Sequence, residues 1–296
     1  MALFAAVLML ATITLSAFMR LSQAGIGCEP WPGCYAQAAR DAAQGMAAPV
    51  VAGHGVAAAR LAHRVVASLV LILAIAMVLS TWLTKPALPR EGWLASAVLA
   101  LAVGLAVLGI VTPGARVPAV TLGNLLGGFL MLALCARLAA PAMFQERRLG
   151  SWAVVGAAVV MLQVGLGALV SGSLAAVSCA GLADCLITAQ AADWPWHALN
   201  PWQVPLLDTG ARVNPAGSLA QWVHRVGALI VLPMLALLGA LAWRRGRLRA
   251  AGALLLLVAL QTVMGLLVSG GGPSIVVVLL HNLFAVLSLA LLVRLA

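Results

Sequence analysis

Long apolar stretches alternate with short polar segments along the whole chain. Eight of them are about 20 residues long or longer, and they cover residues 2–20, 56–84, 92–112, 118–140, 152–173, 217–243, 249–269 and 274–295. At ~1.5 Å of rise per residue, a helix of ~20 residues crosses the ~30 Å hydrocarbon core of a bilayer. The pattern therefore predicts an all-α integral membrane protein with eight transmembrane helices. The first stretch lacks the basic start of a signal peptide, so we expect a retained helix.

The composition narrows the range of functions. Of 296 residues, 64% are apolar and 8% are charged, and the longest polar segment is the loop at about 175–216. In a soluble protein, a formal net charge of +10 would suggest a nucleic-acid partner. Here the basic residues lie mostly in short loops, where they set orientation, so we expect membrane lipid around this chain and no nucleic acid. Chemistry is then confined to the helices and their outer ends.

Basic residues concentrate in three of the loops between the predicted helices. In chain order they are Lys85, Arg90, Arg147, Arg148, Arg244, Arg245, Arg247 and Arg249. By the positive-inside rule these loops face the cytoplasm, and so do both termini. The two long loops at 21–55 and 174–216 then lie outside.

Each outer loop holds one pair of cysteines. Five residues separate Cys28 from Cys34, and five separate Cys179 from Cys185. An oxidising compartment would let each pair close as a disulfide, and the matched spacing favours this over unrelated free thiols or a metal site. The fifth cysteine, Cys135, lies within a predicted helix, where we expect an inert packing residue.

The chain contains an internal duplication. The segment from Asn124 to Arg137 resembles the segment from His281 to Arg294, and both of its ends are offset by 157 positions. The cysteine pairs are offset by 151, and the difference falls in loops. Each copy has four spans, an even number, so the repeat is parallel, with its axis along the membrane normal. We therefore expect two pseudo-symmetric four-helix bundles, in residues 1–145 and 146–296.

Histidines near the outer ends of the spans are the main candidates for chemistry. His63 and His224 each open a span, and each is followed by an arginine, although such groups are costly within a membrane. His281 lies near the start of the last span, and Asn124 has the corresponding place in the first copy. All four spans run from outside to inside, so these residues are expected in one layer near the outer surface.

The second half offers a pair of ligands. His224 and His281 come from two helices of one bundle at a common depth, as two axial imidazoles on a haem iron require. Zinc or copper usually takes a third or fourth strong ligand, and no Asp or Glu within the predicted spans supplies one. A bis-histidine haem is the first hypothesis. Another metal, or histidines that only form hydrogen bonds, are the alternatives.

The arginines beside the histidines suggest how a haem would be oriented. A guanidinium binds a carboxylate through two parallel hydrogen bonds, so Arg64 and Arg225 are candidates to hold propionates at the outer surface. The alternative is that both extend to lipid phosphates. Their repetition beside the histidines favours the propionate role.

Together these motifs resemble those of the haem A synthases. The resemblance covers essentially the whole chain and rests on the four-plus-four duplication, the Trp-Pro within the first cysteine loop, both His-Arg pairs, His281, and Arg20-Leu21-Ser22 after the first span. It implies oxidation of the methyl group at ring position C8 of haem O to the formyl group of haem A, for cytochrome oxidases. It also implies a bacterial inner-membrane location, with haem O synthase or oxidase assembly factors as partners.

The same resemblance implies a role for each half. A haem b cofactor would lie between His224 and His281, and the substrate, haem O or a related porphyrin, would lie at His63. Two positions in the first half depart from the family. A second histidine is usual where this chain has Asn124, and a glutamate is usual where it has Arg60. Asn is a poor iron ligand, so a porphyrin there would be at most five-coordinate from these positions, which leaves the open position that oxygen chemistry needs.

Substitutes for the missing groups come from the outer loops. Glu29 and His54 are the nearest, although a solvated carboxylate and a loop histidine are their ordinary roles. His197 lies beside Trp194 and Trp196 and is expected at the membrane interface.

Two functions fit these patterns. The first is an enzyme of the haem A synthase type, in which haem b passes electrons while a porphyrin near His63 is oxidised. The second is a non-catalytic paralogue that keeps haem b for haem delivery, electron transfer or oxidase assembly. Only the first half of the chain separates the two.

Overall fold

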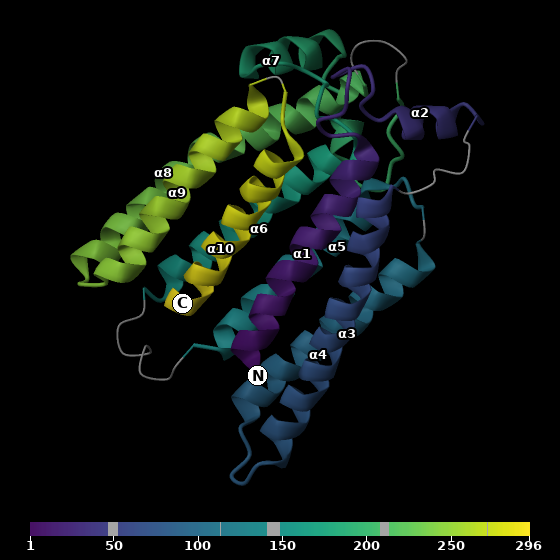
Figure 1. Cartoon of the computed structure of the whole chain (residues 1–296). Coiled ribbons are helices and arrows are strands. Elements are labelled where there is room, and N and C mark those ends of the chain that lie inside the picture. The colour runs from purple at the N-terminus through teal and green to yellow at the C-terminus, as the bar shows by residue number, and fades with distance from the viewer. Residues whose placement is uncertain (47–52, 113, 141–148, 208–212, 271) are drawn as a thin grey trace.

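The chain folds into a bundle of long helices. The computed structural model describes residues 1–46, 53–112, 114–140, 149–207, 213–270 and 272–296, and within these it contains helices and loops but no strand. In the described part of the chain, eight helices are long and apolar enough to cross a membrane: α1 (Ala2–Ala24), α3 (His54–Leu83), α4 (Pro89–Val111), α5 (Pro118–Leu138), α6 (Ser151–Gly172), α8 (Ser218–Arg244), α9 (Leu248–Ser269) and α10 (Ile275–Leu295). The predicted eight-helix, all-α membrane protein is confirmed (Figure 1).

The spanning helices pack as two rings of four. In the first half α1 contacts α3 and α5, and α4 contacts the same two helices. In the second half α6 contacts α8 and α10, and α9 contacts the same two. Each ring is therefore a four-helix bundle. Helix α3 is diagonal to α5 in the first bundle, and α8 is diagonal to α10 in the second.

The two bundles meet along α5 and α10. These helices contact each other, α5 also contacts α6, and α10 also contacts α1. Since α1 corresponds to α6 and α5 to α10 in the duplicated sequence, exchanging the halves reproduces the same contacts. The packing thus agrees with a pseudo-symmetric pair of bundles.

Apolar side chains both fill and cover the bundles. The core includes Phe129 and Leu132 of α5 and Leu289 of α10, all buried. Large apolar side chains also point outward, among them Ile110 of α4 at 76% exposed and Leu237 of α8 at 71%. A soluble monomer rarely exposes so much apolar surface, whereas spanning helices present it to lipid.

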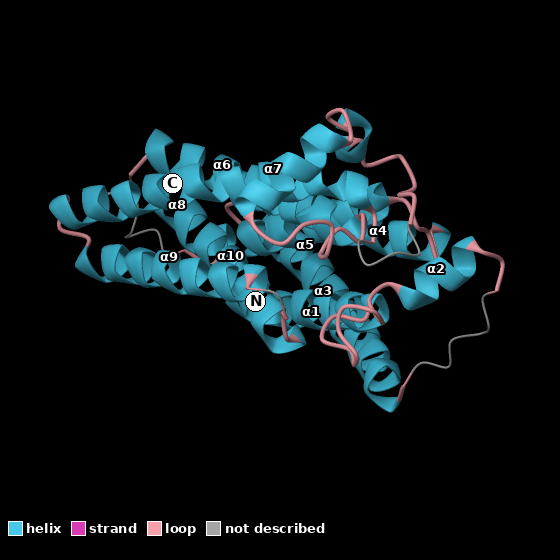
Figure 2. Ribbon diagram, turned by 90° about the horizontal axis from the view of Figure 1, so that it is seen from above, coloured by secondary structure: helices cyan, strands magenta, loops and turns pink. Residues whose placement is uncertain are grey.

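Short helices lie in the two long loops that contain the cysteine pairs, and none of them is long enough to cross a membrane. They are α2 (Gln37–Ala43), α7 (Leu182–Ala191) and the 3₁₀ turns η2 (Trp196–Leu199) and η3 (Pro215–Gly217). Helices α2 and α7 lie at one end of the bundle, and both chain termini lie at the other (Figure 1). Seen from above, loops and short helices cover the ends of the long ones (Figure 2).

Two predicted boundaries need correction. Helix α1 continues past Arg20 to Ala24, and it ends at Gly25 with φ +79°, a conformation that glycine adopts without steric cost. His54 is the first residue of α3 and not a loop residue. The predicted division between residues 145 and 146, like the basic pair Arg147 and Arg148, lies outside the described residues.

Candidate functional site

Helix starts place the candidate ligands at a common depth. His224, His281 and Asn124 each lie six residues after the first residue of α8, α10 and α5, respectively. Six residues of α-helix correspond to ~9 Å. His63 lies nine residues into α3. These positions agree with the predicted layer of candidate ligands near one end of the bundle, which stays a prediction.

The two histidines of the second half come from diagonal helices. In the described residues α8 and α10 are separated by α6 and α9, which contact both of them. The rings of His224 and His281 are close enough to interact electrostatically. Diagonal helices face the interior of a four-helix bundle, which is where such bundles hold cofactors.

Gln163 of α6 supports His224. Its amide nitrogen Nε2 donates to the backbone oxygen of His224 at 2.8 Å and lies 3.1 Å from ring nitrogen Nδ1. On the same helix face one turn later, Gly167 gives the ring its space, since a Cβ there would lie 3.0 Å from His224 Cε1. Backbone and ring of His224 are thus both held by α6.

Gln261 of α9 contacts the ring of His281. Its Nε2 lies 3.2 Å from Nδ1 and 3.3 Å from Nε2 of the ring. Gly265 lies one turn later, with its missing Cβ 3.7 Å from His281 Cε1. The amide oxygen of Gln261 is buried and has no hydrogen-bond partner within the described residues. This orphaned acceptor lies next to a ring that can offer an N–H.

These donors fit a haem iron better than another metal. Two imidazoles approach the bundle interior from diagonal helices, and the described residues contain no group of three or more His, Cys, Asp or Glu that would suit zinc or copper. The amides of Gln163 and Gln261, which contact the two rings, are the kind of partner that orients a metal-bound imidazole. His224 and His281 would hold the iron, and Gln163 and Gln261 would hold the imidazoles.

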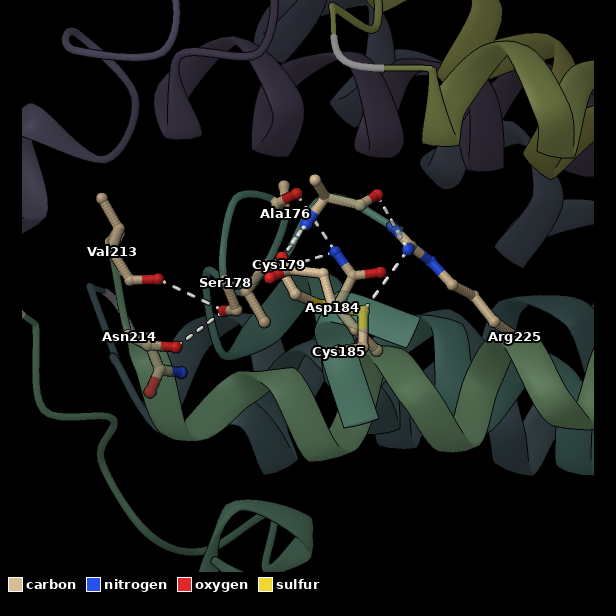
Figure 3. Close-up of a disulfide and its surroundings, with 11 residues drawn as sticks. Ala176, Ser178, Cys179, Asp184, Cys185, Val213, Asn214 and Arg225 are labelled. Atoms are coloured by element: carbon tan, nitrogen blue, oxygen red, sulfur yellow. Dashed lines mark hydrogen bonds between the residues drawn. A yellow bond between two sulfur atoms is a disulfide. The ribbon is translucent and has the colours of Figure 1, made fainter. Parts of the chain in front are cut away.

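The outer mouth of this bundle is pinned by side-chain hydrogen bonds. The side-chain amide of Asn214 donates to the backbone oxygen of Ser173 at 2.8 Å. The hydroxyl of Ser178 donates to the backbone oxygen of Asn214 at 2.6 Å. Gln221 of α8 donates to the carbonyl of Ala175 at 2.8 Å. Gly217 fits only because it has no side chain, since a Cβ would lie 2.6 Å from that of Ala175. Figure 3 shows the hydrogen bond from Ser178 to Asn214 beside the second disulfide.

Both predicted disulfides are present. Cys28 pairs with Cys34, and Cys179 pairs with Cys185, while Cys135 is a buried free thiol in the core of α5. In Figure 3, Arg225 reaches toward the second disulfide loop. Its guanidinium donates to the carbonyl of Ala180 and contacts Cys185. The structure gives this arginine a loop partner, so a propionate role for it stays a prediction.

The first half differs at every equivalent position. His63 is half-buried, Arg64 and Arg60 are exposed, and Asn124 is half-buried on the diagonal helix α5. Within the described residues, none of their side chains makes a hydrogen bond. Instead, Leu105 of α4 packs where α5 has Gly127. The structure thus brings these residues into one bundle but gives them no polar support.

None of the proposed substitutes lies in this bundle interior. Glu29 and His54 are exposed at the outer end. His197 is exposed in η2, next to the stacked rings of Trp194 and Trp196, whose centroids are 6.0 Å apart. Trp194 also lies against Trp222 of α8. This aromatic cluster fits the predicted interfacial position of His197.

Sequence reasoning missed the two glutamines and one tyrosine. The signal for the glutamines was available: Gln163 and Gln261 each precede a glycine by four residues, one helical turn. Tyr35, 1% exposed, joins the two cysteine loops, because its phenol oxygen accepts a hydrogen bond from the backbone N–H of Ala176. Burial raises the pKa of the Tyr35 phenol well above its ordinary value, so the hydroxyl stays protonated. No sequence pattern marked this residue.

Fold and site together define a polytopic, all-helical membrane protein with a paired-histidine site inside a four-helix bundle. The chain belongs to the COX15-CtaA family, described as cytochrome oxidase assembly protein, which it matches over residues 1–293. It is also similar to a protein named Heme A synthase from Shewanella oneidensis (strain MR-1). The two are 29% identical over 285 aligned positions, which cover 87% of this chain and 83% of that protein. The family membership expected from the motifs is confirmed.

Proposed function

We propose that the protein is a haem A synthase-type oxidoreductase, which oxidises the C8 methyl of haem O toward the formyl of haem A with haem b as cofactor. The observation that carries this proposal is the pair His224 and His281, which face one bundle interior from diagonal helices. Each has an amide and a glycine behind it. Bound haem b would supply one-electron transfer. The relative named Heme A synthase supports the enzymatic reading.

The two halves have different roles in this proposal. Residues 146–296 hold the cofactor, and residues 1–145 receive haem O or a related porphyrin at His63. Asn124 is opposite His63 in the diagonal arrangement and is a weak ligand at best, so one side of the substrate iron stays open. Arg64 is exposed near the outer end and is available for a substrate propionate.

A non-catalytic paralogue is the second candidate, and one observation favours it. Among the described residues, the spanning helices of the first bundle carry no acidic side chain at the end where His63 lies, and position 60 is an arginine. The one acid in a spanning helix, Glu91, lies in the first turn of α4, at the end away from His63. Such a protein would use haem b for haem delivery, electron transfer or oxidase assembly.

The proposal includes a location. We place the protein in a bacterial inner membrane with both termini in the cytoplasm, because the basic loops lie at the end opposite the disulfides. Haem O synthase or oxidase assembly factors are the partners expected there.

The test is to purify the protein from a host that also makes haem O, extract the pigments with acid, and separate them by chromatography with mass detection. Haem A or its hydroxylated intermediate, lost in His63→Ala but retained in His54→Ala, would support the enzyme. Haem b alone, with haem O unconverted, would favour the paralogue. A preparation without haem b would overturn both.

A further inference from the structure

Gln163 and Gln261 occupy equivalent places beside the two histidines of the second bundle. Gln163 precedes Gly167 by four residues on α6, and Gln261 precedes Gly265 by four on α9. Residues four apart share a helix face, so on each helix the glutamine amide contacts one imidazole and the glycine leaves space for its ring. The same device occurs twice, on the two helices that separate α8 from α10.

We propose that Gln163 and Gln261 are positioning residues for the haem ligands. They would fix the orientation of each imidazole and bind the ring nitrogen that faces away from the iron. This inference rests on the proposed haem b site at His224 and His281. It assigns the two glutamines a part in setting the redox potential of the haem held there.

The orphaned oxygen of Gln261 carries the chemical argument. An imidazole bound to iron through one nitrogen keeps a proton on the other, and that N–H needs an acceptor. The amide nitrogen of Gln261 lies nearly equally far from both nitrogens of His281, at 3.2 and 3.3 Å, while its buried oxygen has no partner. A half-turn of the amide exchanges nitrogen and oxygen, so the acceptor is available to either ring nitrogen.

Gln163 is held more rigidly. Its Nε2 is shared between the backbone oxygen of His224 and ring nitrogen Nδ1. Gly227, one turn after His224, leaves the space for this amide, since a Cβ there would collide with Gln163 Oε1. The amide therefore couples the ring of His224 to its own backbone and to α6.

The first bundle has no counterpart for either amide. At the offset of 151 set by the cysteine pairs, Thr12 takes the place of Gln163, and its hydroxyl donates to its own helix at Leu8, 2.9 Å away. Helix α4, the counterpart of α9, contains no Asn or Gln, and Leu105 packs on α5. The positioning amides thus occur only in the half proposed to retain its haem, and the half proposed to exchange its porphyrin lacks them.

The test compares Gln163→Leu, Gln261→Leu and Gln261→Glu in the full chain purified with haem b. The matched control is Gln221→Leu, which removes an amide from α8 that binds the carbonyls of Ala175 and Ala176. An acceptor at Gln261 makes the imidazole of His281 a stronger donor to ferric iron, so Gln261→Leu should raise the midpoint potential and Gln261→Glu should lower it. We expect about a tenfold change in the ratio of oxidised to reduced haem at a fixed ambient potential, which is ~59 mV for one electron. Gln163→Leu removes a donor and should change the ring orientation of His224.

Redox titration of the haem b absorbance is the measurement, with electron paramagnetic resonance of the ferric form as a second readout of ring orientation. Opposite shifts of the midpoint potential in Gln261→Leu and Gln261→Glu, a changed ring orientation in Gln163→Leu, and a control at the wild-type value support the proposal. Wild-type potential in every variant that retains haem overturns it and leaves the haem site intact. Absence of haem b from the wild-type protein would instead overturn the proposed function. Gln163→Met and Gln261→Met, which keep the side-chain length, replace any Leu variant that does not fold.

Discussion

Arg225 donates a hydrogen bond to the carbonyl oxygen of Ala180 at 3.0 Å, so the second cysteine loop is tied to the helix that carries His224. The same guanidinium nitrogen lies 3.3 Å from Sγ of Cys185. In the first half, Arg64 also follows a histidine, but its side chain is exposed and makes no hydrogen bond within the described residues. The duplication therefore places one residue type in two environments.

Replacing Arg225 should loosen the second outer loop. Arg225→Gln removes a charged donor from two loop contacts, and because the side chain is only half-buried the expected loss of stability is ~1 kcal/mol. Arg64→Gln is the matched control and should leave stability unchanged. Thermal unfolding and limited proteolysis of the outer loops measure both. Equal destabilisation by the two variants would contradict the loop role of Arg225.

Thiol counting checks the disulfides. Four of the five cysteines are paired, and Cys135 is buried in the core. Native protein should bind no alkylating reagent, denatured protein should bind one molecule, and denatured, reduced protein should bind five. Mass spectrometry of the intact chain reads these numbers directly. Three or more labels on denatured protein before reduction would mean that at least one pair is open.

Tyr35 should make the protein sensitive to alkali. The phenol of an unfolded chain ionises near pH 10, whereas burial keeps Tyr35 protonated at that pH. Above about pH 10 the unfolded state therefore binds fewer protons than the native state, and stability falls as the pH rises. Because Tyr35 is the only tyrosine in the chain, near-ultraviolet tyrosinate absorbance follows this single group.

Tyr35→Phe is the control for that titration. It removes the ionisable hydroxyl and the hydrogen bond to Ala176, so it should cost ~1 kcal/mol at neutral pH and abolish the alkaline loss attributed to the phenol. An unchanged alkaline transition in Tyr35→Phe would assign the transition to another group.

Hydropathy predicted the spanning helices because each must bury its backbone hydrogen bonds and face lipid with apolar side chains. It could not predict α2 and α7, which are short and lie outside the apolar stretches. The histidines were predictable because ionisable groups are rare within spans. Gln163 and Gln261 were not recognised because an uncharged amide in a spanning helix is less costly than an ionisable group, and because their function depends on which helices are neighbours. Likewise, the partner of Arg225 depends on a loop conformation that sequence does not specify.

Removing either histidine should eliminate the low-spin haem b spectrum. His224→Ala and His281→Ala each leave the iron with one imidazole at most, so the bis-histidine absorbance should be absent from the purified protein. His197→Ala is the matched control, since that ring is exposed in η2 and away from the bundle interior. Normal spectra in both site variants would rule out these ligands.

A methyl group added at Gly167 should test whether the imidazole of His224 lies against α6. Alanine normally stabilises a helix by about 1 kcal/mol relative to glycine. Gly252→Ala on α9 should show this gain, because a Cβ there meets nothing within 4 Å. Gly167→Ala adds a methyl carbon 3.0 Å from Cε1 of His224, which is tighter than ordinary contact, so the ring must tilt or shift. Haem content should then fall and the low-spin signal should broaden, while Gly252→Ala keeps both at the wild-type level. If Gly167→Ala instead gains stability with an unchanged spectrum, the imidazole does not lie against α6, and the positioning role of Gln163 loses its geometric basis.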